Sequence, residues 1–418
     1  MTLAGNFKIK TLTATLFLVS LFFFVGCNNQ TTNDDLYPTY RWSGETMGTV
    51  YRITVVDNHI DNHVDSRVDK SANGKVNNKP VSEEVDASNL DAKLDLAKQR
   101  VSEQLNAIIM SMSTYEAESE ISVFNRLPAN QCQLMSQDFI NVLELSIQVH
   151  KASGGAFNPL VGPLVERWGF GHSNAAFVYP EAKELARLLA LADLSKLLIN
   201  TNTQSLCKTD DIEIDFSAIA KGYAVDRVAA ELSVLSINNY LVDVGGEVIV
   251  SGHNPQGGAW RLAIEKPVFR AGEIEQVVSL QDVAIATSGD YRNFFEYQGK
   301  RYSHTIDVRS GYPVQHNVAS VSVIAETAAE ADAWATALNV MAPAEIKQLA
   351  AEQNLAVFII TRDNIQVDDS RELETPVDPV KDGFINDGVS TGDTVLEVDA
   401  PTRIETWYSE KFQSYISK

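Results

Sequence analysis

The stretch TAAEADAWATALNVM (327–341) combines a carboxylate and a hydroxyl at helical spacing. Asp332 and Thr336 are four residues apart, so a helix places both on one face, one turn from each other. Two oxygens so placed suit a hard cation such as Mg²⁺, which prefers oxygen ligands and usually keeps waters or substrate phosphates. An ordinary helix rich in Ala, Asp and Thr remains the alternative.

A second group of polar residues lies in DFSAIAKGYAVD (215–226). The pattern predicts a strand DIEIDF that Asp215 closes, where ligand sites often form, followed by a helix with Lys221 in its first turn. A cation gains nothing from the dipole at that helix end, so we expect the ammonium to meet an anion. The compact turn SAIA allows the Ala218 carbonyl to face a metal ion. The alternative is a surface acid and base flanking a tight joint.

Two further stretches could bind or react. GGAFNPLVGPLVERWGFG (154–171) is rich in Gly, Pro and aromatic residues and lacks a helical or strand period. It predicts a shaped loop, which could clasp a flat ring or be purely structural. The stretch 286–314 predicts a hairpin that turns at EYQGKRY and brings His304 and Asp307 near one strand end. His304 is a candidate general base, because an unperturbed histidine has a pKa near ~6.5; a structural histidine is the alternative.

The elements that must position these groups are both helices and strands. Apolar spacing predicts helices over 90–112, 136–155 and 181–192, and two more over 218–235 and 327–341. Alternating stretches predict a first strand over 41–56, several strands between 211 and 325, and a closing strand within 403–412. Two polar insertions separate them, at about 57–88 and about 368–399. The second holds ten acidic and two basic residues and is expected to be a solvated surface excursion.

Composition limits the partners of the chain. Its 418 residues carry a formal net charge of −21, which would repel nucleic acid. An anionic ligand would therefore need local help from a metal ion or from helix N-termini.

The N-terminus predicts export. Lys8 and Lys10 precede an apolar run that ends in FVGC, the pattern of a secretory signal, and FVGC resembles a bacterial lipobox whose cysteine becomes lipid-modified. We therefore expect a lipoprotein signal peptide over 1–26, lipidation of Cys27, a polar tether over 27–40, and one domain over 41–418. An uncleaved membrane anchor is the alternative, and either way the domain lies outside the cytoplasm.

The remaining cysteines, Cys132 and Cys207, have no companions typical of a nucleophile or a metal site. In an oxidising compartment two cysteines can pair, but sequence does not place them in contact. A disulfide and two buried thiols are both open.

Taken in order, several stretches resemble the ApbE-type FAD:protein FMN transferases. The resemblance runs from about Arg41 to Met341. The stretches that carry it are GETMGTVYRI, STYEAESEISVFN, GGAFNPLVGPLVERWGFG, IDFSAIAKGYAVD, DVGGEVIVSG, ATSGDYRNFF, SHTIDVRSGYPV and EADAWATAL. It implies an α+β fold, with one catalytic domain of antiparallel sheets and flanking helices (T-fold-like).

The resemblance also implies roles for individual residues. Mg²⁺ would be held by the Ala218 carbonyl, Asp332 and Thr336, and His304 would be the catalytic base. FAD would touch Met47, Tyr115, Ala156, Phe157, Asn158, Asp215, Lys221 and Ile306. Many members carry Asp in place of Asn158 and Thr or Ser in place of Ala218. Ligation by a carbonyl survives the second change, whereas the first alters the hydrogen bonds on offer.

The implied reaction transfers the FMN half of FAD to a Thr or Ser hydroxyl of an acceptor protein and releases AMP. Acceptors in the family are subunits of the sodium-translocating NADH:quinone reductase and of RNF complexes, so the expected place is the periplasmic side of the inner membrane, with the outer membrane as the alternative. Two other functions are the alternatives. One is a Mg²⁺-dependent FAD pyrophosphatase, which would give FMN and AMP, and the other is a flavin-binding lipoprotein without turnover. The first would use nearly the same site, whereas Asp332, Thr336 and His304 argue against the second, because storage of a flavin needs neither a metal nor a base.

Overall fold

The computed structural model describes most of the region expected to form the domain. It covers residues 35–58, 87–171, 179–267, 272–289, 294–297, 300–362 and 403–417. The expected signal peptide, Cys27, most of the tether and nearly all of both insertions lie outside these ranges. Within them, no helix combines the length and the hydrophobicity needed to cross a membrane.

The centre of the fold is an eight-stranded sheet in which every neighbouring pair is antiparallel. The sheet confirms the expected α+β class with antiparallel pairing. In spatial order its strands are β1 (Thr39–Thr46), β2 (Thr49–Val56), β6 (Tyr240–Val244), β7 (Glu247–Ser251), β10 (Val283–Gly289), β15 (Val318–Ala325), β16 (Ala356–Arg362) and β17 (Ile404–Tyr408).

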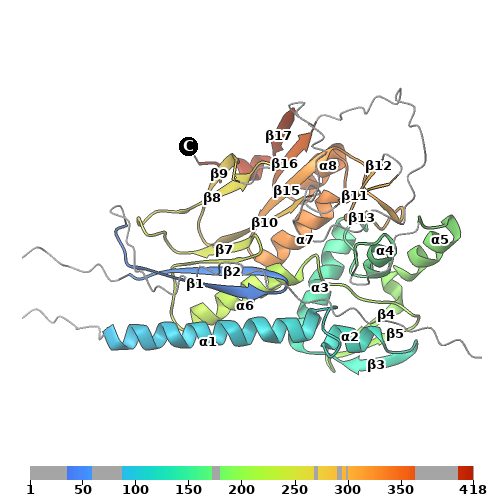
Figure 1. Cartoon of the computed structure of the whole chain (residues 1–418), viewed down its shortest axis with the longest axis horizontal. Helices are drawn as coiled ribbons and strands as arrows, with labels where there is room; N and C mark the ends of the chain where they lie inside the picture. Colours follow the sequence, from blue (N-terminus) through green and yellow to red (C-terminus); the bar gives the residue numbers. More distant parts are fainter. Residues whose placement is uncertain are drawn as a thin grey trace, which may run out of the picture.

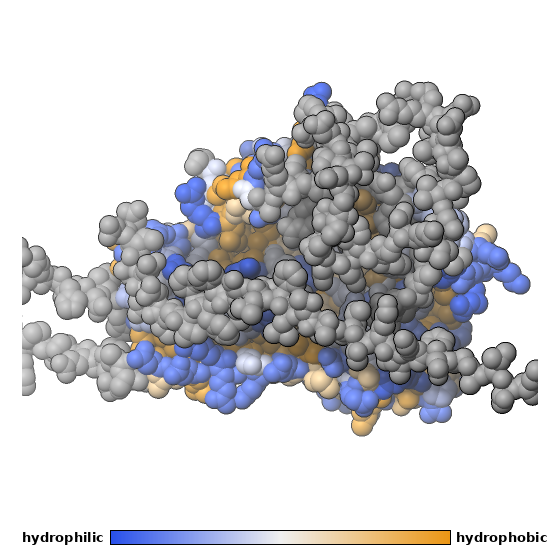
Figure 2. Space-filling view, viewed as in Figure 1, coloured by the Kyte–Doolittle hydropathy of each residue, from blue (hydrophilic) through white to orange (hydrophobic). Residues whose placement is uncertain are grey.

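Helices cover one face of this sheet in two layers (Figure 1). Helix α7 (Ala328–Asn339) packs on β10 and β15, and α6 (Ala220–Val234) packs on α7, β6 and β7. Helix α1 (Ala87–Met112) lies outside α6, and α3 (Gln137–Ala152) contacts both α1 and α7. Figure 2 shows polar side chains along the lower edge of the molecule, where α1 runs in Figure 1. Helix α7 is therefore an inner helix, and its many buried alanines let its neighbours come close.

The closest of these approaches is between α6 and the start of α7. A Cβ on Gly222 would lie 2.3 Å from the Ala328 carbonyl oxygen, so only glycine fits there. The neighbouring Asp226 carboxylate accepts hydrogen bonds from the backbone N–H groups of Ala328 (2.7 Å) and Ala329 (2.9 Å). It thereby satisfies donors that a helix N-terminus leaves free. One glycine and one carboxylate fix α7 against α6.

The opposite face of the sheet carries a second, smaller core. The ribbon of β8 (Trp260–Glu265) and β9 (Ile274–Leu280) and the short helix α9 (Glu410–Gln413) cover it. Trp260, Phe358 and Phe412 are buried there. Because apolar residues line both faces, the central strands read as nearly continuous hydrophobic runs.

The remaining elements surround the edge of the helical layers. One of them is a three-stranded sheet in which β5 (Ser205–Lys208) lies between β3 (Gln131–Leu134) and β4 (Leu197–Asn200). Cys132 on β3 forms a disulfide with Cys207, directly opposite on β5. The sequence left open whether these cysteines form a disulfide or two buried thiols, and the structure has the disulfide. In full, the elements outside the eight-stranded sheet and the parts that cover it are α2 (Glu120–Asn125), β3 (Gln131–Leu134), α4 (Gly162–Arg167), α5 (Ala182–Leu191), η1 (Leu194–Lys196), β4 (Leu197–Asn200), β5 (Ser205–Lys208), β11 (Phe294–Tyr297), β12 (Lys300–Ser303), β13 (Ile306–Asp307), β14 (Tyr312–Pro313) and α8 (Pro343–Glu352).

Three expected elements differ in the structure. The single strand predicted over 41–56 is a hairpin of β1 and β2, because Met47 (φ 49°) and Gly48 (φ 70°) both adopt the left-handed conformation that a two-residue type I′ turn requires. The loop predicted over 154–171 contains the short helix α4, which begins with a proline in its first turn, where proline is well tolerated.

The predicted strand DIEIDF is also wrong: residues 211–216 form no strand of any sheet. The side-chain amide of Asn125 accepts from the N–H of Ile214 and donates to its carbonyl, both at 2.8 Å. The fully buried Lys208 ammonium donates to the carbonyls of Asn125 (2.8 Å) and Ile212 (3.0 Å). Two side chains therefore replace a neighbouring strand.

The α6–α7 contact generates a stability prediction. Gly222→Ala should lower the free energy of unfolding by about 1–3 kcal/mol, because the added methyl group forces two backbones apart in a packed core. Guanidinium unfolding followed by circular dichroism measures this. The control is Gly258→Ala, where a Cβ would meet only Asn254 Oδ1, at 3.9 Å. Equal losses in the two variants would contradict the explanation.

The pairing of β16 with β17 generates a second prediction, on the acidic insertion. Arg362 and Ile404 are register partners at the end of this antiparallel pair, so a short connection can join them. Deleting 368–399 leaves 363–367 and 400–402 for that turn, and should change the thermal midpoint and the catalytic activity little. A large loss of activity at an unchanged midpoint would show that the insertion docks a partner.

Candidate active site

A cavity of about 1130 Å³ opens between α7, the start of α6 and the loops around them. It gathers almost all of the residues that the sequence singled out for binding and catalysis. Those that line it are Tyr115, Ala156, Phe157, Asn158, Asp215, Ala218, Lys221, His304, Ile306, Asp332 and Thr336.

Two of the expected FAD contacts differ from the others in position. Met47 is half-buried in the β1–β2 turn and is not among the residues that line the cavity. Tyr115 does line it, and 74% of this residue is exposed. The cavity is therefore open to solvent at the Tyr115 end.

The expected metal ligands come from α7 and from the turn before α6. Asp332 is buried, and its Oδ2 accepts a hydrogen bond from the N–H of Gly222 at 3.1 Å. Thr336 lies one turn further along α7, with its Oγ1 3.2 Å from the Ser288 hydroxyl on β10. Ala218 is half-buried in the turn. The structure thus confirms that the carboxylate and the hydroxyl lie on one helix face and line the same cavity as Ala218.

This donor set suits a hard cation that keeps some of its other ligands. Within the described ranges no three His, Cys, Asp or Glu residues form a metal-binding group. A site made of one carboxylate, one hydroxyl and one carbonyl would not be such a group. It would supply only oxygen donors and leave coordination positions for waters or phosphates, as Mg²⁺ prefers.

Beside Asp332, the Lys221 ammonium forms an ion pair with Glu247. Its Nζ lies 2.5 Å from Glu247 Oε1, and Glu247 is only 3% exposed. Burial, and then the nearby charge of Asp332, raise the pKa of Glu247, against the opposing effect of Lys221. Burial also raises the pKa of Asp332.

The negative charges of Asp332 and Glu247 favour the charged form of Lys221. Burial alone would lower the pKa of Lys221, but Asp332 and Glu247 outweigh it and the pKa is raised. Two buried carboxylates thus share one ammonium. The cavity has a local excess of negative charge, which a divalent cation at Asp332 would relieve.

His304, which lines the same cavity, follows β12 and is half-buried. The Phe170 ring meets it edge-on, with 6.3 Å between the ring centroids. The next residue, Thr305, accepts a hydrogen bond from the Asn339 amide of α7 at 3.2 Å. The helix that carries the expected metal ligands therefore also supports the histidine.

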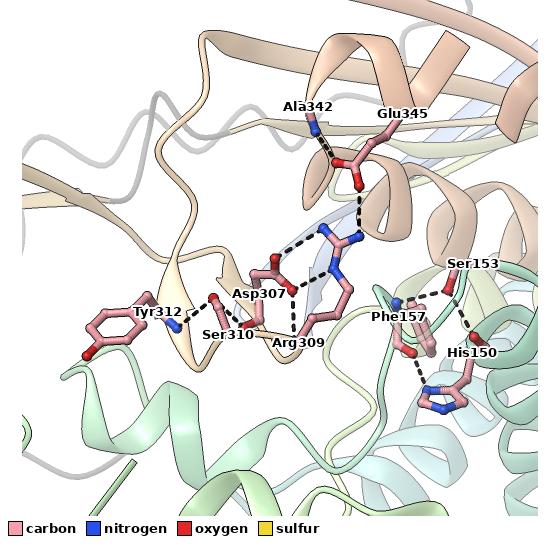
Figure 3. Close-up of polar contacts among 9 residues, drawn as sticks. All are labelled: His150, Ser153, Phe157, Asp307, Arg309, Ser310, Tyr312, Ala342 and Glu345. Atoms are coloured by element: carbon pink, nitrogen blue, oxygen red, sulfur yellow. Dashed lines mark hydrogen bonds and ion pairs between the residues drawn. The ribbon is translucent and has the colours of Figure 1, made fainter. Parts of the chain in front are cut away.

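An arginine fixes the loop that continues from His304. Figure 3 shows Arg309 lying between Asp307 and Glu345. It donates to both carboxylate oxygens of Asp307, at 2.9 and 3.1 Å, and to Glu345 at 3.1 Å. The other Glu345 oxygen accepts from the N–H of Ala342, which precedes α8, at 3.0 Å. This bidentate pair anchors the loop to the start of a helix.

The loop at 154–158 is held by its own neighbours. His150 Nδ1 donates to the Phe157 carbonyl at 2.7 Å, and the Phe157 N–H donates to the Ser153 hydroxyl at 3.1 Å (Figure 3). Asn158 donates to the Ala192 carbonyl and accepts from the N–H of Leu160, both at 2.8 Å. Both polar ends of Asn158 thus bind the protein itself, which gives this residue a structural role in addition to lining the cavity.

Glu247 is the main residue of the cavity to which the sequence assigned no role. It lies in DVGGEVIVSG, a stretch recognised only as part of the resemblance. The available signal was a charged residue at the start of the apolar run EVIV, directly after two glycines. Its partner Lys221 comes from a different element, and local spacing does not show that contact.

Comparison with known proteins identifies the family of the chain. A model described as the ApbE family matches residues 47–359. The chain belongs to the ApbE family. One relative, an FAD:protein FMN transferase from Haemophilus influenzae, is 36% identical over 330 residues, which is 77% of this chain and 86% of the relative. A protein of the same description from Escherichia coli is 32% identical over 83% of this chain and 91% of its own length.

Solved structures of the family share the fold. The flavin transferase ApbE from Vibrio cholerae superposes with a TM-score of 0.67 at 28% identity, covering 91% of this chain and 99% of that one. The apo form of the flavinyl transferase ApbE from Pseudomonas stutzeri gives 0.64 at 32% identity, covering 78% and 92%. The mixed α+β architecture is thus that of the family.

The donor set generates a binding prediction. Asp332→Asn should weaken Mg²⁺ binding by at least about tenfold, because it removes the only charged oxygen of the expected donor set. Isothermal titration with Mg²⁺ in the absence of nucleotide measures this. Glu330→Gln, on the same helix but outside the cavity, is the control and should bind as the wild type does. Equal affinities in all three proteins would place the metal elsewhere.

Proposed function

We propose that this protein is an FAD:protein FMN transferase, which moves the FMN half of FAD to a Thr or Ser hydroxyl of an acceptor protein and releases AMP. The observation that carries the proposal is one cavity that joins Asp332 and Thr336 to Lys221 and His304, in a chain of the ApbE family. The relatives from Haemophilus influenzae and Escherichia coli are both named FAD:protein FMN transferase.

The size of the cavity supports a ligand as large as a dinucleotide. Small-molecule sites commonly measure about 300–1,000 Å³, and this cavity of about 1130 Å³ exceeds that range. It is open at the Tyr115 end, so part of an acceptor protein can enter as well.

Ala218, Asp332 and Thr336 would hold Mg²⁺, which when bound neutralises charge on the phosphate oxygens as the phosphoanhydride breaks. The chain's own groups then align and orient the reactants, which is most of what phosphoryl transfer asks of a protein. Lys221 provides the positive charge at the opening of α6 that a pyrophosphate needs. Asp215 shapes the same corner, because its Oδ1 accepts from the N–H of Ser217 at 2.7 Å.

His304 acts in the proposal as the general base. The acceptor hydroxyl oxygen forms a bond to the FMN phosphorus, its proton passes to the His304 imidazole, and the bond between that phosphorus and the AMP oxygen breaks. AMP leaves with the electron pair of that bond. The anchored loop around Arg309 keeps the imidazole in place during this exchange.

We further propose that the chain acts outside the cytoplasm, with residues 1–26 as a lipoprotein signal and Cys27 as the lipidated residue. The Cys132–Cys207 disulfide supports an oxidising compartment. Flavin-carrying subunits of NADH:quinone reductase or RNF-type complexes, at the periplasmic side of the inner membrane, are the proposed acceptors. We assign the fold to the T-fold-like architecture as part of the same proposal.

The test is incubation with FAD, Mg²⁺ and an acceptor domain. Wild-type protein should produce a fluorescent flavin band on the acceptor together with AMP. Asp332→Ala should lose transfer by a factor of about 10² or more, because the metal contributes several kcal/mol to such transition states. Glu330→Ala, on the same helix, should retain it.

The same assay separates the other functions. FMN and AMP without a labelled acceptor would identify a pyrophosphatase, in which water replaces the hydroxyl. FAD that stays intact under saturating Mg²⁺ would identify a binding protein without turnover. Normal transfer by Asp332→Ala would remove the metal site from the proposal.

A further inference from the structure

Glu247 carries a buried oxygen that the protein leaves without a hydrogen bond. Its Oε1 holds the Lys221 ammonium at 2.5 Å. Its Oε2 has no hydrogen-bond partner among the described residues, although the residue is 97% buried and lines the cavity. A buried acceptor without a donor is unfavourable, so an oxygen in this position is suited to a ligand that brings the donor.

The hairpin that carries Glu247 fixes where this oxygen lies. Gly245 (φ 66°) and Gly246 (φ 106°) form the turn between β6 and β7. The Asp243 carboxylate accepts from the N–H of Gly246 at 2.9 Å and stabilises that turn. Glu247 is the first residue of β7, opposite Val244. The carboxylate is therefore positioned before any ligand arrives, and little side-chain entropy is lost on binding.

The chemistry of the missing partner is restricted. Phosphate oxygens of a nucleotide have no proton to donate at neutral pH. A second metal ion is disfavoured, because the Lys221 ammonium already occupies the other oxygen of the same carboxylate. In a flavin dinucleotide, hydroxyl groups flank the pyrophosphate on both sides, on the ribityl chain and on the ribose. These are the nearest hydrogen-bond donors to a phosphate group held at Lys221.

We propose that Glu247 is a ligand-binding residue of this site, whose Oε2 accepts a hydrogen bond from a sugar-chain hydroxyl of the bound nucleotide while its Oε1 holds Lys221 at the pyrophosphate. The inference rests on the proposed function and deepens it. It assigns to one side chain both the placement of the cation and the recognition of a hydroxyl beside the phosphates.

The substitution Glu247→Gln separates these two roles. A glutamine can still accept from Lys221 through its carbonyl oxygen, but it then places an N–H₂ donor where Oε2 stands. Hydrogen bonds to charged groups are worth enough to change affinity by about tenfold or more. Glu247→Gln should therefore bind the hydroxyl-bearing half of the substrate at least about tenfold more weakly.

The dissociation constants of FMN and of ADP, each with Mg²⁺, show which half that is. Quenching of flavin fluorescence measures the first and isothermal titration the second. If the variant binds FMN more weakly but ADP as before, the hydroxyl that Glu247 binds is on the ribityl chain. If it binds ADP more weakly but FMN as before, that hydroxyl is on the ribose. Glu330→Gln, a carboxylate on α7 outside the cavity, is the matched control and should change neither constant.

The sign of the change distinguishes a hydrogen bond from simple electrostatics. Removing a negative charge near an anionic ligand strengthens binding if Glu247 acts only through its charge. Tighter or unchanged binding of both nucleotides by Glu247→Gln would therefore overturn the inference.

Analogues give a second measurement on the wild-type protein, which holds even if Glu247→Gln unfolds. Deoxy-ADP analogues, or a flavin alkyl phosphate without ribityl hydroxyls, should lose the same factor in affinity as the variant does. Where the variant folds, the two losses should not add, since both remove one interaction. Equal affinity of the wild type for all these analogues and their parents would also overturn the inference. If the wild type binds no FAD at all, the proposed function fails, and this inference fails with it.

Discussion

The close contact between α6 and α7 at Gly222 is the constraint on which the rest of the site depends. With no side chain at this position, the two helices come close enough for the Gly222 N–H to reach Asp332 Oδ2 at 3.1 Å. The contact that packs two helices therefore also orients the expected metal ligand. Asp226 adds a second restraint by capping α7. Packing and chemistry are linked here, because a shift of α7 would move Asp332 and Thr336 together.

A consequence of this packing is electrostatic. Burial raises the pKa of both Asp332 and Glu247, and the charge of Asp332 raises the pKa of Glu247 further. The single ammonium of Lys221 does not balance two carboxylates. Because the chain carries a net charge of −21, a cavity for an anionic ligand needs additional positive charge nearby. The proposed Mg²⁺ provides it, and the buried carboxylates provide a reason for the cation to bind.

The parts of the site that the sequence predicts are those set by local spacing. Asp332 and Thr336 are four apart on one helix, and Lys221 opens another, so their placement follows from helical geometry. Contacts between distant segments do not follow. The side chains of Asn125 and Lys208 take the place of a neighbouring strand beside 211–216, and a periodicity argument takes that stretch for a sheet strand. The family resemblance, rather than periodicity, brought the separate stretches to one site.

Glu247 shows why such contacts escape local reasoning and what they add. Its neighbours in sequence are apolar, and its burial would be unfavourable without the ammonium that α6 brings from another part of the chain. The ion pair with Lys221 engages one carboxylate oxygen and leaves the other buried without a hydrogen-bond partner among the described residues. A protein that only needed to hold Lys221 in place could do so with a partner that is fully satisfied. In the proposed complex, a hydroxyl of the nucleotide donates the hydrogen bond that Glu247 Oε2 lacks. The free energy that the free protein loses by burying this oxygen without a donor is then regained when the nucleotide binds.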